Sequence, residues 1–168
     1  MGDTSILRKV ILKGNEMGKK PIIVLGADHA AFGMKEFIKK VLKDLGYRVE
    51  DVGTDSRESV DYPDFAEKVA EKVAGSSDRK GILGCGTGIG AAIAANKVPG
   101  IRAALVNSVR TARLSVEHDN ANILVLAGRP YRKKEVARIV KGWLKAEFQG
   151  GRHARRVKKS KKLEEKYG

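Results

Sequence analysis

The chain of 168 residues is long enough for one domain to bury a hydrophobic core without metal ions, and its single cysteine excludes an intrachain disulfide framework. No apolar stretch approaches the roughly 20 residues of a membrane span, and residues 1–20 lack the apolar core of a signal peptide, so we expect a soluble, cytoplasmic protein. The formal net charge of +14 indicates an anionic partner, namely nucleic acid, an acidic membrane surface or a phosphorylated small molecule.

From residue 22 onward, short apolar runs alternate with segments that repeat apolar residues at helical spacing. The apolar runs predict five strands, over residues 22–27, 47–53, 81–85, 101–106 and 122–128. The other segments predict helices over residues 34–45, 63–75, 88–98, 108–118 and 136–148, and a last, basic helix over 152–166. Because strand and helix alternate strictly, we expect a single-domain, three-layer α/β/α sandwich with a five-stranded parallel sheet.

Basic residues are concentrated at the two ends of the chain. Residues 1–20 carry five Lys or Arg against two acidic residues, and residues 152–168 carry eight against two. We therefore divide the chain into an N-terminal extension over residues 1–20 with no assigned role, one domain over 21–157, and a basic C-terminal tail over 158–168.

Ligands of an open parallel sheet bind outside the carboxyl ends of the strands. This rule selects the loops over residues 27–29, 53–54, 85–90, 106–107 and 128–129. The stretch ILGCGTGIGAAIAANK contains the third of these loops, and its glycines at 84, 86, 88 and 90 leave backbone N–H groups bare at the start of a helix. We expect this glycine loop to hold a phosphate or an oxyanion.

The single cysteine, Cys85, lies in this glycine loop. A thiol that faces free N–H groups at a helix start is stabilised as the thiolate, so it can act as a base or a nucleophile near neutral pH. This interpretation requires the sulfur to be ionisable and open to a ligand. The alternative is a buried cysteine that only packs, which is the commoner role of a free cysteine.

The glycine loop also satisfies a dinucleotide-binding fingerprint, with Gly86, Gly88 and Ala91 at the required spacing. A nicotinamide or flavin site is disfavoured, because the motif follows the third strand and Asn107 stands about 20 residues later, where an acidic residue would bind the ribose. A redox enzyme is therefore an alternative that cofactor titration would test.

Histidines and arginines lie next to the predicted loops. Arg152, Arg155 and Arg156 follow a Gly-Gly pair on adjoining faces of one helical turn, and Arg129 follows the fifth strand. Guanidinium groups suit phosphate, although such residues are also common on solvated basic surfaces. All three histidines lie beside a loop or an arginine cluster: His29, His118 and His153.

Five motifs occur in order between residues 22 and 157: GADHAAF, DYPDFA, GCGTGIGAAIAANKVPGIRAAL, EHDNAN and GGRHARRV. Together they resemble the type B ribose-5-phosphate isomerases, a family that includes the galactose-6-phosphate isomerase subunits. The resemblance implies a Rossmann-like fold and a cofactor-independent aldose-ketose isomerase that interconverts ribose 5-phosphate and ribulose 5-phosphate through a cis-enediolate. It further implies a homodimer or tetramer with the site at the subunit interface, and no metal ion or organic cofactor. We expect no membrane partner, and nucleic acid is a disfavoured one.

The resemblance also implies roles for individual residues. The general base would be Cys85, with Thr87 close to it, and His118 would help to open the sugar ring. The enediolate would be held by the glycine loop, which includes Gly86, Gly88, Ile89 and Gly90. The remaining sugar and phosphate contacts would come from Asp28, Tyr62, Asp119, His29, Arg129, Arg152 and Arg156.

Two positions separate this chain from other members of the family it resembles. A second branch uses a glutamate base where this chain has Ala91, which favours Cys85 as the base. Asp119 stands where many relatives have asparagine, so either Asn120 makes the sugar contact or the preferred sugar differs. The alternatives are therefore isomerisation of an allose, galactose or tetrose phosphate and, from a different class, a basic nucleic-acid-binding module. The low aromatic content of 5% disfavours the module, because few side chains can stack on bases.

Overall fold

The computed structural model describes residues 20–168, so the predicted N-terminal extension lies outside the described residues apart from Lys20. Five strands are present: β1 (Ile22–Ala27), β2 (Val49–Asp51), β3 (Arg79–Cys85), β4 (Ala103–Leu105) and β5 (Ile123–Ala127). They form one sheet in the order β2-β1-β3-β5-β4, and every pair is parallel. The predicted five-stranded parallel sheet is confirmed.

The edge strands differ from the sequence prediction in length. β2 and β4 each contain three residues, because each pairs with only one neighbour and its ends lack a second hydrogen-bonded partner. The inner strands β1, β3 and β5 are buried along most of their length, as expected for strands covered on both faces.

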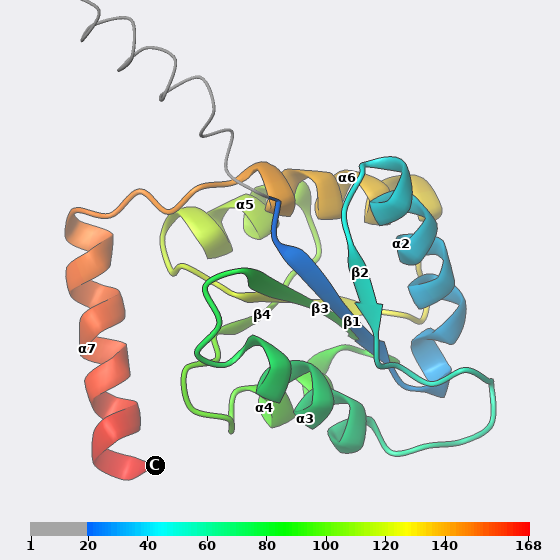
Figure 1. Ribbon diagram of the computed structural model, residues 1–168, viewed down its shortest axis with the longest axis horizontal. Coiled ribbons are helices and arrows are strands. Elements are labelled where there is room, and N and C mark those ends of the chain that lie inside the picture. Colours follow the sequence, from blue (N-terminus) through cyan, green and yellow to red (C-terminus); the bar gives the residue numbers. More distant parts are fainter. Residues whose placement is uncertain (1–19) are drawn as a thin grey trace, which may run out of the picture.

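Helices cover both faces of the sheet (Figure 1). The helical segments are the 3₁₀ turn η1 (His29–Ala31) and the α-helices α2 (Phe32–Asp44), α3 (Tyr62–Val73), α4 (Ile89–Ala95), α5 (Val109–Glu117), α6 (Lys133–Lys145) and α7 (Arg152–Tyr167). The core of one face is built with α2, α5 and α6, and the core of the other face with α3 and α4. The predicted three-layer sandwich is confirmed. Among the described residues, no helix has the length and apolar character needed to cross a membrane.

The alternation of side chains along the strands decides which face each residue serves. In β1, Ile23 and Leu25 point to the face covered by α2 and α6, whereas Val24 points to the face covered by α3 and α4. In β3, Leu83 belongs to the second face, and Cys85, two residues later, belongs to the same face. The thiol therefore points toward the α3 and α4 layer.

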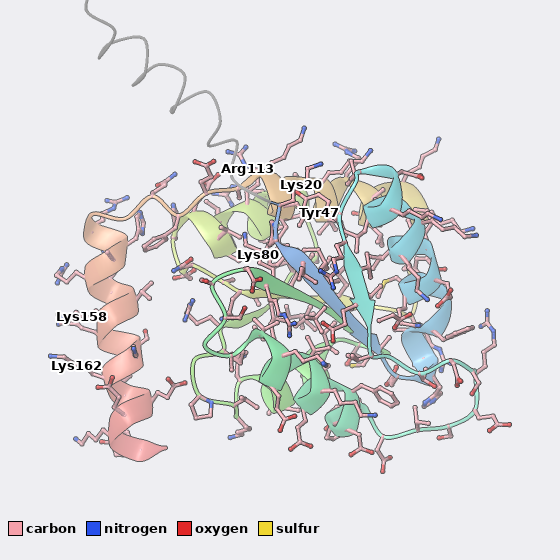
Figure 2. The ribbon with its side chains drawn as sticks, in the orientation of Figure 1. Lys20, Tyr47, Lys80, Arg113, Lys158 and Lys162 are labelled. Carbon is pink, nitrogen blue, oxygen red and sulfur yellow. The ribbon has the colours of Figure 1, made fainter. Side chains whose placement is uncertain are left out.

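Helix α7 stands apart from the rest of the molecule, beyond the amino edge of the sheet (Figure 1). The Gly100 N–H donates to Oε1 of Glu164 at 2.9 Å, which ties the helix to the loop before β4. The helix runs without a break from Arg152 to Tyr167, so the predicted basic tail continues a helix that starts inside the predicted domain. Figure 2 shows Lys158 and Lys162 projecting from it.

A glycine in the central strand allows the second helical layer to pack closely. A Cβ atom on Gly81 would lie 2.8 Å from Cγ1 of both Ile123 and Val69. We expect Gly81→Ala to lower the free energy of unfolding by ~1–3 kcal/mol, the usual cost of overpacking a core.

The matched control is Gly33→Ala in α2, where a Cβ would meet only the tips of Arg57 and Tyr131 at 3.4 and 3.5 Å. Alanine in place of a helical glycine is expected to raise stability by up to ~1 kcal/mol. Urea denaturation at one protein concentration measures both changes. Equal stabilities of the two variants would contradict the packing described here.

Candidate active site

The three inner strands end side by side at the carboxyl edge of the sheet, and backbone hydrogen bonds join the loops that follow them. The N–H of Asp28, after β1, donates to the Gly84 carbonyl in β3 at 3.3 Å. The N–H of Gly128, after β5, donates to the Cys85 carbonyl at 2.8 Å. The loops after β1 and β5 therefore meet around the end of the central strand β3.

The glycine loop after β3 turns back over the thiol. The Gly88 N–H donates to Sγ of Cys85 at 3.2 Å. Gly88 is the N-cap of α4 and has a left-handed backbone, with φ of 79°. A Cβ on this residue would lie 2.5 Å from Cδ1 of Leu105 and 3.2 Å from the Leu126 carbonyl carbon, so only glycine fits this turn.

Cys85 is nearly buried in the single chain, with 4% of its surface exposed. Within residues 20–168 it lines none of the described cavities. The sequence prediction needs a sulfur that is open to a ligand, whereas in the single chain the sulfur is nearly buried, in the core of the α3 and α4 face and in contact with the Gly88 N–H. Thr87, in the glycine loop next to it, is exposed, and its Oγ1 accepts from the Ile89 N–H at 3.3 Å.

Asp28 and His29 are held in fixed orientations beside this loop. Oδ1 of Asp28 accepts from the N–H groups of Ala30 at 3.0 Å and Ala31 at 3.2 Å, which caps η1. Nδ1 of His29 lies 3.1 Å from the Val60 nitrogen and 3.2 Å from the Val60 carbonyl oxygen, so the backbone of Val60 fixes the orientation of the imidazole ring. A ligand would contact the opposite atoms, Oδ2 of Asp28 and Nε2 of His29.

Tyr62 and Arg129 complete the group of predicted site residues at the carboxyl edge. Tyr62 begins α3 and is 40% exposed. A Cβ on Gly90 would lie 2.6 Å from Cζ of Tyr62, so the tyrosine ring packs directly on the first turn of α4. Arg129 is exposed, and its N–H donates to the Gly86 carbonyl at 3.0 Å.

Four predicted site residues lie at the opposite, amino edge of the sheet: His118, Asp119, Arg152 and Arg156. Helix α5 returns the chain to the start of β5, so its C-cap, His118, lies at this edge. The exposed Asp119 follows it, and the two exposed arginines are in the first turns of α7. The Gln149 N–H donates to the Glu117 carbonyl at 3.0 Å and joins the two helices. A single chain therefore does not bring these four residues to Cys85.

The amino edge contains one pair that the sequence did not predict. The imidazole rings of His118 and His153 are stacked, with centroids 4.1 Å apart and planes inclined by 9°. Burial lowers the pKa of His153, and the positive charges of His118, Arg152 and Arg156 lower it further, whereas Asp119 acts in the opposite direction. The only sequence signal was that both histidines lie beside loops, and nothing in their separation predicts contact.

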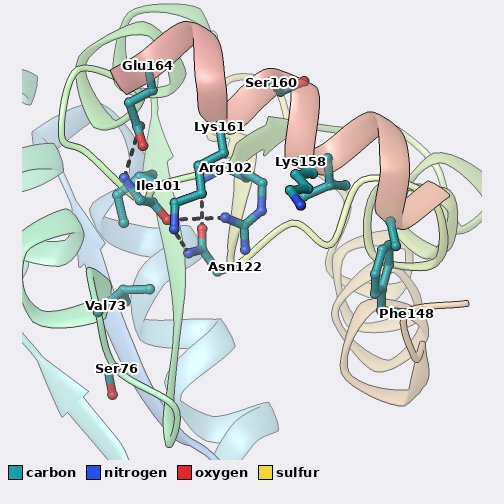
Figure 3. Close-up of a pocket in the computed structure, with 14 residues that line it drawn as sticks. Val73, Ser76, Ile101, Arg102, Asn122, Phe148, Lys158, Ser160, Lys161 and Glu164 are labelled. Atoms are coloured by element: carbon teal, nitrogen blue, oxygen red, sulfur yellow. Dashed lines mark hydrogen bonds between the residues drawn. The ribbon is translucent and has the colours of Figure 1, made fainter. Parts of the chain in front are cut away.

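A cleft of about 520 Å³ lies beneath α7, also at the amino edge (Figure 3). Nε of Arg102 donates to the Asn120 carbonyl at 2.8 Å, and Nδ2 of Asn122 donates to the Gly100 carbonyl at 2.9 Å. None of the predicted site residues lines this cleft. In the part of the chain that the structure describes, no group of three or more His, Cys, Asp or Glu is placed to hold a metal ion.

Comparisons with known proteins show the family to which the chain belongs. The profile of the Ribose/Galactose Isomerase family matches residues 23–160. The ribose-5-phosphate isomerase B of Escherichia coli K12 is 42% identical over 144 residues, which cover 86% of this chain and 97% of the relative. The structure of ribose-5-phosphate isomerase B from Clostridium thermocellum is 52% identical in sequence and has a TM-score of 0.85. The match covers 88% of this chain and 99% of that structure. The crystal structure of ribose-5-phosphate isomerase B from Mycoplasma genitalium with bound ribulose-5-phosphate is 45% identical in sequence and has a TM-score of 0.82. The match covers 86% of this chain and 96% of that structure.

The burial of the only cysteine generates a prediction about its reactivity. We expect a disulfide reagent such as Ellman's reagent to modify native Cys85 at least about tenfold more slowly than the same thiol in urea, because the Gly86–Gly90 loop covers the sulfur. Absorbance at the released thiolate measures both rates, and a single cysteine makes the assignment unambiguous. Equal rates in the two conditions would show that the loop does not protect the sulfur.

Proposed function

The chain belongs to the ribose/galactose isomerase family, and from this premise we propose that it interconverts ribose 5-phosphate and ribulose 5-phosphate. The relatives named ribose-5-phosphate isomerase B support this reaction. The observation in this chain that carries the proposal is the Cys85 sulfur, held by the Gly88 N–H beneath a glycine loop. Asp28, His29 and Tyr62 surround that loop with groups suited to hydroxyls and phosphate.

In the proposed mechanism Cys85 is the base that moves the proton. The thiolate removes the proton from C2 of the open-chain aldose, and the electron pair of that C–H bond forms the C1–C2 double bond of an enediolate with its charge on O1. The proton on O2 passes to O1, the thiol returns its proton to C1, and the carbonyl forms at C2. The overall reaction is a proton transfer and needs no oxidant or reductant.

The glycine loop stabilises the charge of the enediolate. Helix α4 begins at Ile89, and the first N–H groups of a helix have no partner within it. The glycines at 86, 88 and 90 let a ligand approach the backbone of this loop closely, although in the free chain the Gly88 N–H donates to Sγ of Cys85 and the Ile89 N–H to Oγ1 of Thr87. A preorganised donor of this kind contributes ~3 kcal/mol to the stability of the transition state.

The neighbouring side chains orient the substrate. Oδ2 of Asp28 and the hydroxyl of Tyr62 bind sugar hydroxyls, while the imidazole of His29 and the guanidinium of Arg129 bind the phosphate. The phosphate is held at a fixed distance from the sulfur. Binding energy from the phosphate end of the sugar therefore positions C1 and C2 against the base.

The remaining predicted residues come from a second copy of the chain. His118, Arg152 and Arg156 lie at the amino edge, so they reach a Cys85 only if it belongs to the other subunit. Beside the glycine loop, Ile89 and Ile93 are 55% and 58% exposed, which is unusual for isoleucines and provides an apolar surface for a partner. We propose a two-fold dimer in which each site joins the carboxyl edge of one chain to the α5 and α7 ends of the other.

The base assignment is tested by Cys85→Ala. We expect the rate of ketose formation from ribose 5-phosphate to fall by ~10²–10⁴-fold, the usual contribution of a general base. A matched control is Ser115→Ala, which removes one small, buried polar atom that donates only to the Ala112 carbonyl at 2.8 Å. Full activity of Cys85→Ala, with wild-type thermal stability, would overturn the role of the thiol.

The shared site is tested by mixing two inactive variants, Cys85→Ala and His118→Asn, after unfolding and refolding them together. In a heterodimer one site receives both wild-type residues and the other receives neither, so random pairing restores roughly a quarter of the wild-type rate. Each variant refolded alone provides the control. If the mixture stays inactive while heterodimers are detected by mass spectrometry, the two residues do not serve one site across the interface.

A further inference from the structure

His153 is a buried side chain to which the proposed mechanism gives no role. It lies in the first turn of α7 and is 6% exposed, although its neighbours Arg152 and Ala154 are exposed. Its ring covers one face of the His118 imidazole, with 4.1 Å between centroids and 9° between planes. The two rings are nearly parallel and in contact, so the His118 ring cannot tilt out of its plane without breaking the stack.

Backbone hydrogen bonds around the pair hold the two rings against each other. The Gln149 N–H donates to the Glu117 carbonyl at 3.0 Å, immediately before His118. Gly150 and Gly151 both have positive φ, at 65° and 54°, and form the turn that brings α7 back against the end of α5. The His153 N–H donates to the Gly150 carbonyl at 3.0 Å. The stack therefore forms where these backbone contacts hold the start of α7 against the end of α5.

Burial and the surrounding positive charges favour the uncharged form of the His153 imidazole. Burial and the positive charges of His118, Arg152 and Arg156 lower the pKa of His153, and only Asp119 favours its protonation. An uncharged ring can remain stacked on a neighbouring imidazole in either protonation state of that neighbour, because a cation over an aromatic face is attracted to it. Two imidazolium rings at this distance would repel.

We propose that His153 is a positioning residue for His118: its stacked ring sets the plane of the His118 imidazole while that imidazole exchanges a proton with the sugar. The proposal rests on the proposed function and on the role that the family resemblance implies for His118, which is to help open the ring of ribose 5-phosphate. Ring opening needs a proton delivered to the ring oxygen and removed from the O1 hydroxyl, so the direction of the imidazole nitrogens decides its rate.

A purely structural role would have a different kinetic signature. His153 shares the first turns of α7 with Arg152 and Arg156, so loss of the helix anchor would displace the proposed phosphate contacts and raise KM. Loss of ring orientation alone would lower kcat and leave phosphate affinity unchanged. The inhibition constant of inorganic phosphate reports the arginine contacts separately from the chemistry.

The test compares His153→Ala, which removes the stack, with His153→Phe, which keeps a flat ring without a titratable nitrogen. For His153→Ala we expect kcat for ribose 5-phosphate to fall by about tenfold or more while KM and the phosphate inhibition constant stay within about threefold. For His153→Phe we expect kcat within about threefold of the wild type. Wild-type kcat in His153→Ala, or a loss in both variants that appears in KM and phosphate inhibition, would overturn the proposal.

A second measurement does not depend on activity. The chain has three histidines, so their Cε1–H proton resonances can be assigned by substitution. The stacked ring should shift the His118 resonance in the wild type and in His153→Phe, and His153→Ala should remove that ring-current shift. Identical His118 shifts in all three proteins would show that no stack forms. If instead the stack is seen and His118→Asn keeps full isomerase activity, the proposed role of His118 fails and the positioning proposal fails with it.

Discussion

The hydrogen bond from the Gly88 N–H to the Cys85 sulfur is the contact on which the proposed site depends. It forms because β3 ends at the thiol and the chain then turns through a left-handed glycine into α4. The backbone of Leu126 and the side chain of Leu105 leave no space for a Cβ at that turn. The sulfur, the backbone of the glycine loop and the neighbouring strand ends are consequently fixed relative to one another before any substrate binds.

The direction of the strands divides the site into two halves. All strands are parallel, so the loops that follow them gather at the carboxyl edge with Cys85. The residues that follow helices, His118 among them, return to the amino edge. No adjustment of side chains within one chain can bring these edges together, because the length of the sheet separates them. A second copy is therefore a topological requirement of the mechanism that we propose.

Part of the net charge of +14 lies beside the proposed site. Arg129 lies at the carboxyl edge, while Arg152 and Arg156 lie at the start of α7, and the lysines of α7 continue the positive surface along an exposed helix. A phosphorylated sugar approaching the interface between two copies would meet positive charge from both sides. Within the protein, burial lowers the pKa of His153, and the positive charges of Arg152 and Arg156 contribute to the same shift.

The sequence by itself determined the layers and the chemistry of the loops. Apolar runs of strand length between helical repeats predicted the parallel sheet, and glycines around Cys85 predicted a turn with exposed N–H groups, since both follow from local spacing and backbone freedom. Only the tertiary structure decided that the glycine loop covers the sulfur, that His118 lies at the other edge, and that His153 stacks on it. These features depend on contacts between residues far apart in the chain, and no local pattern encodes such distances.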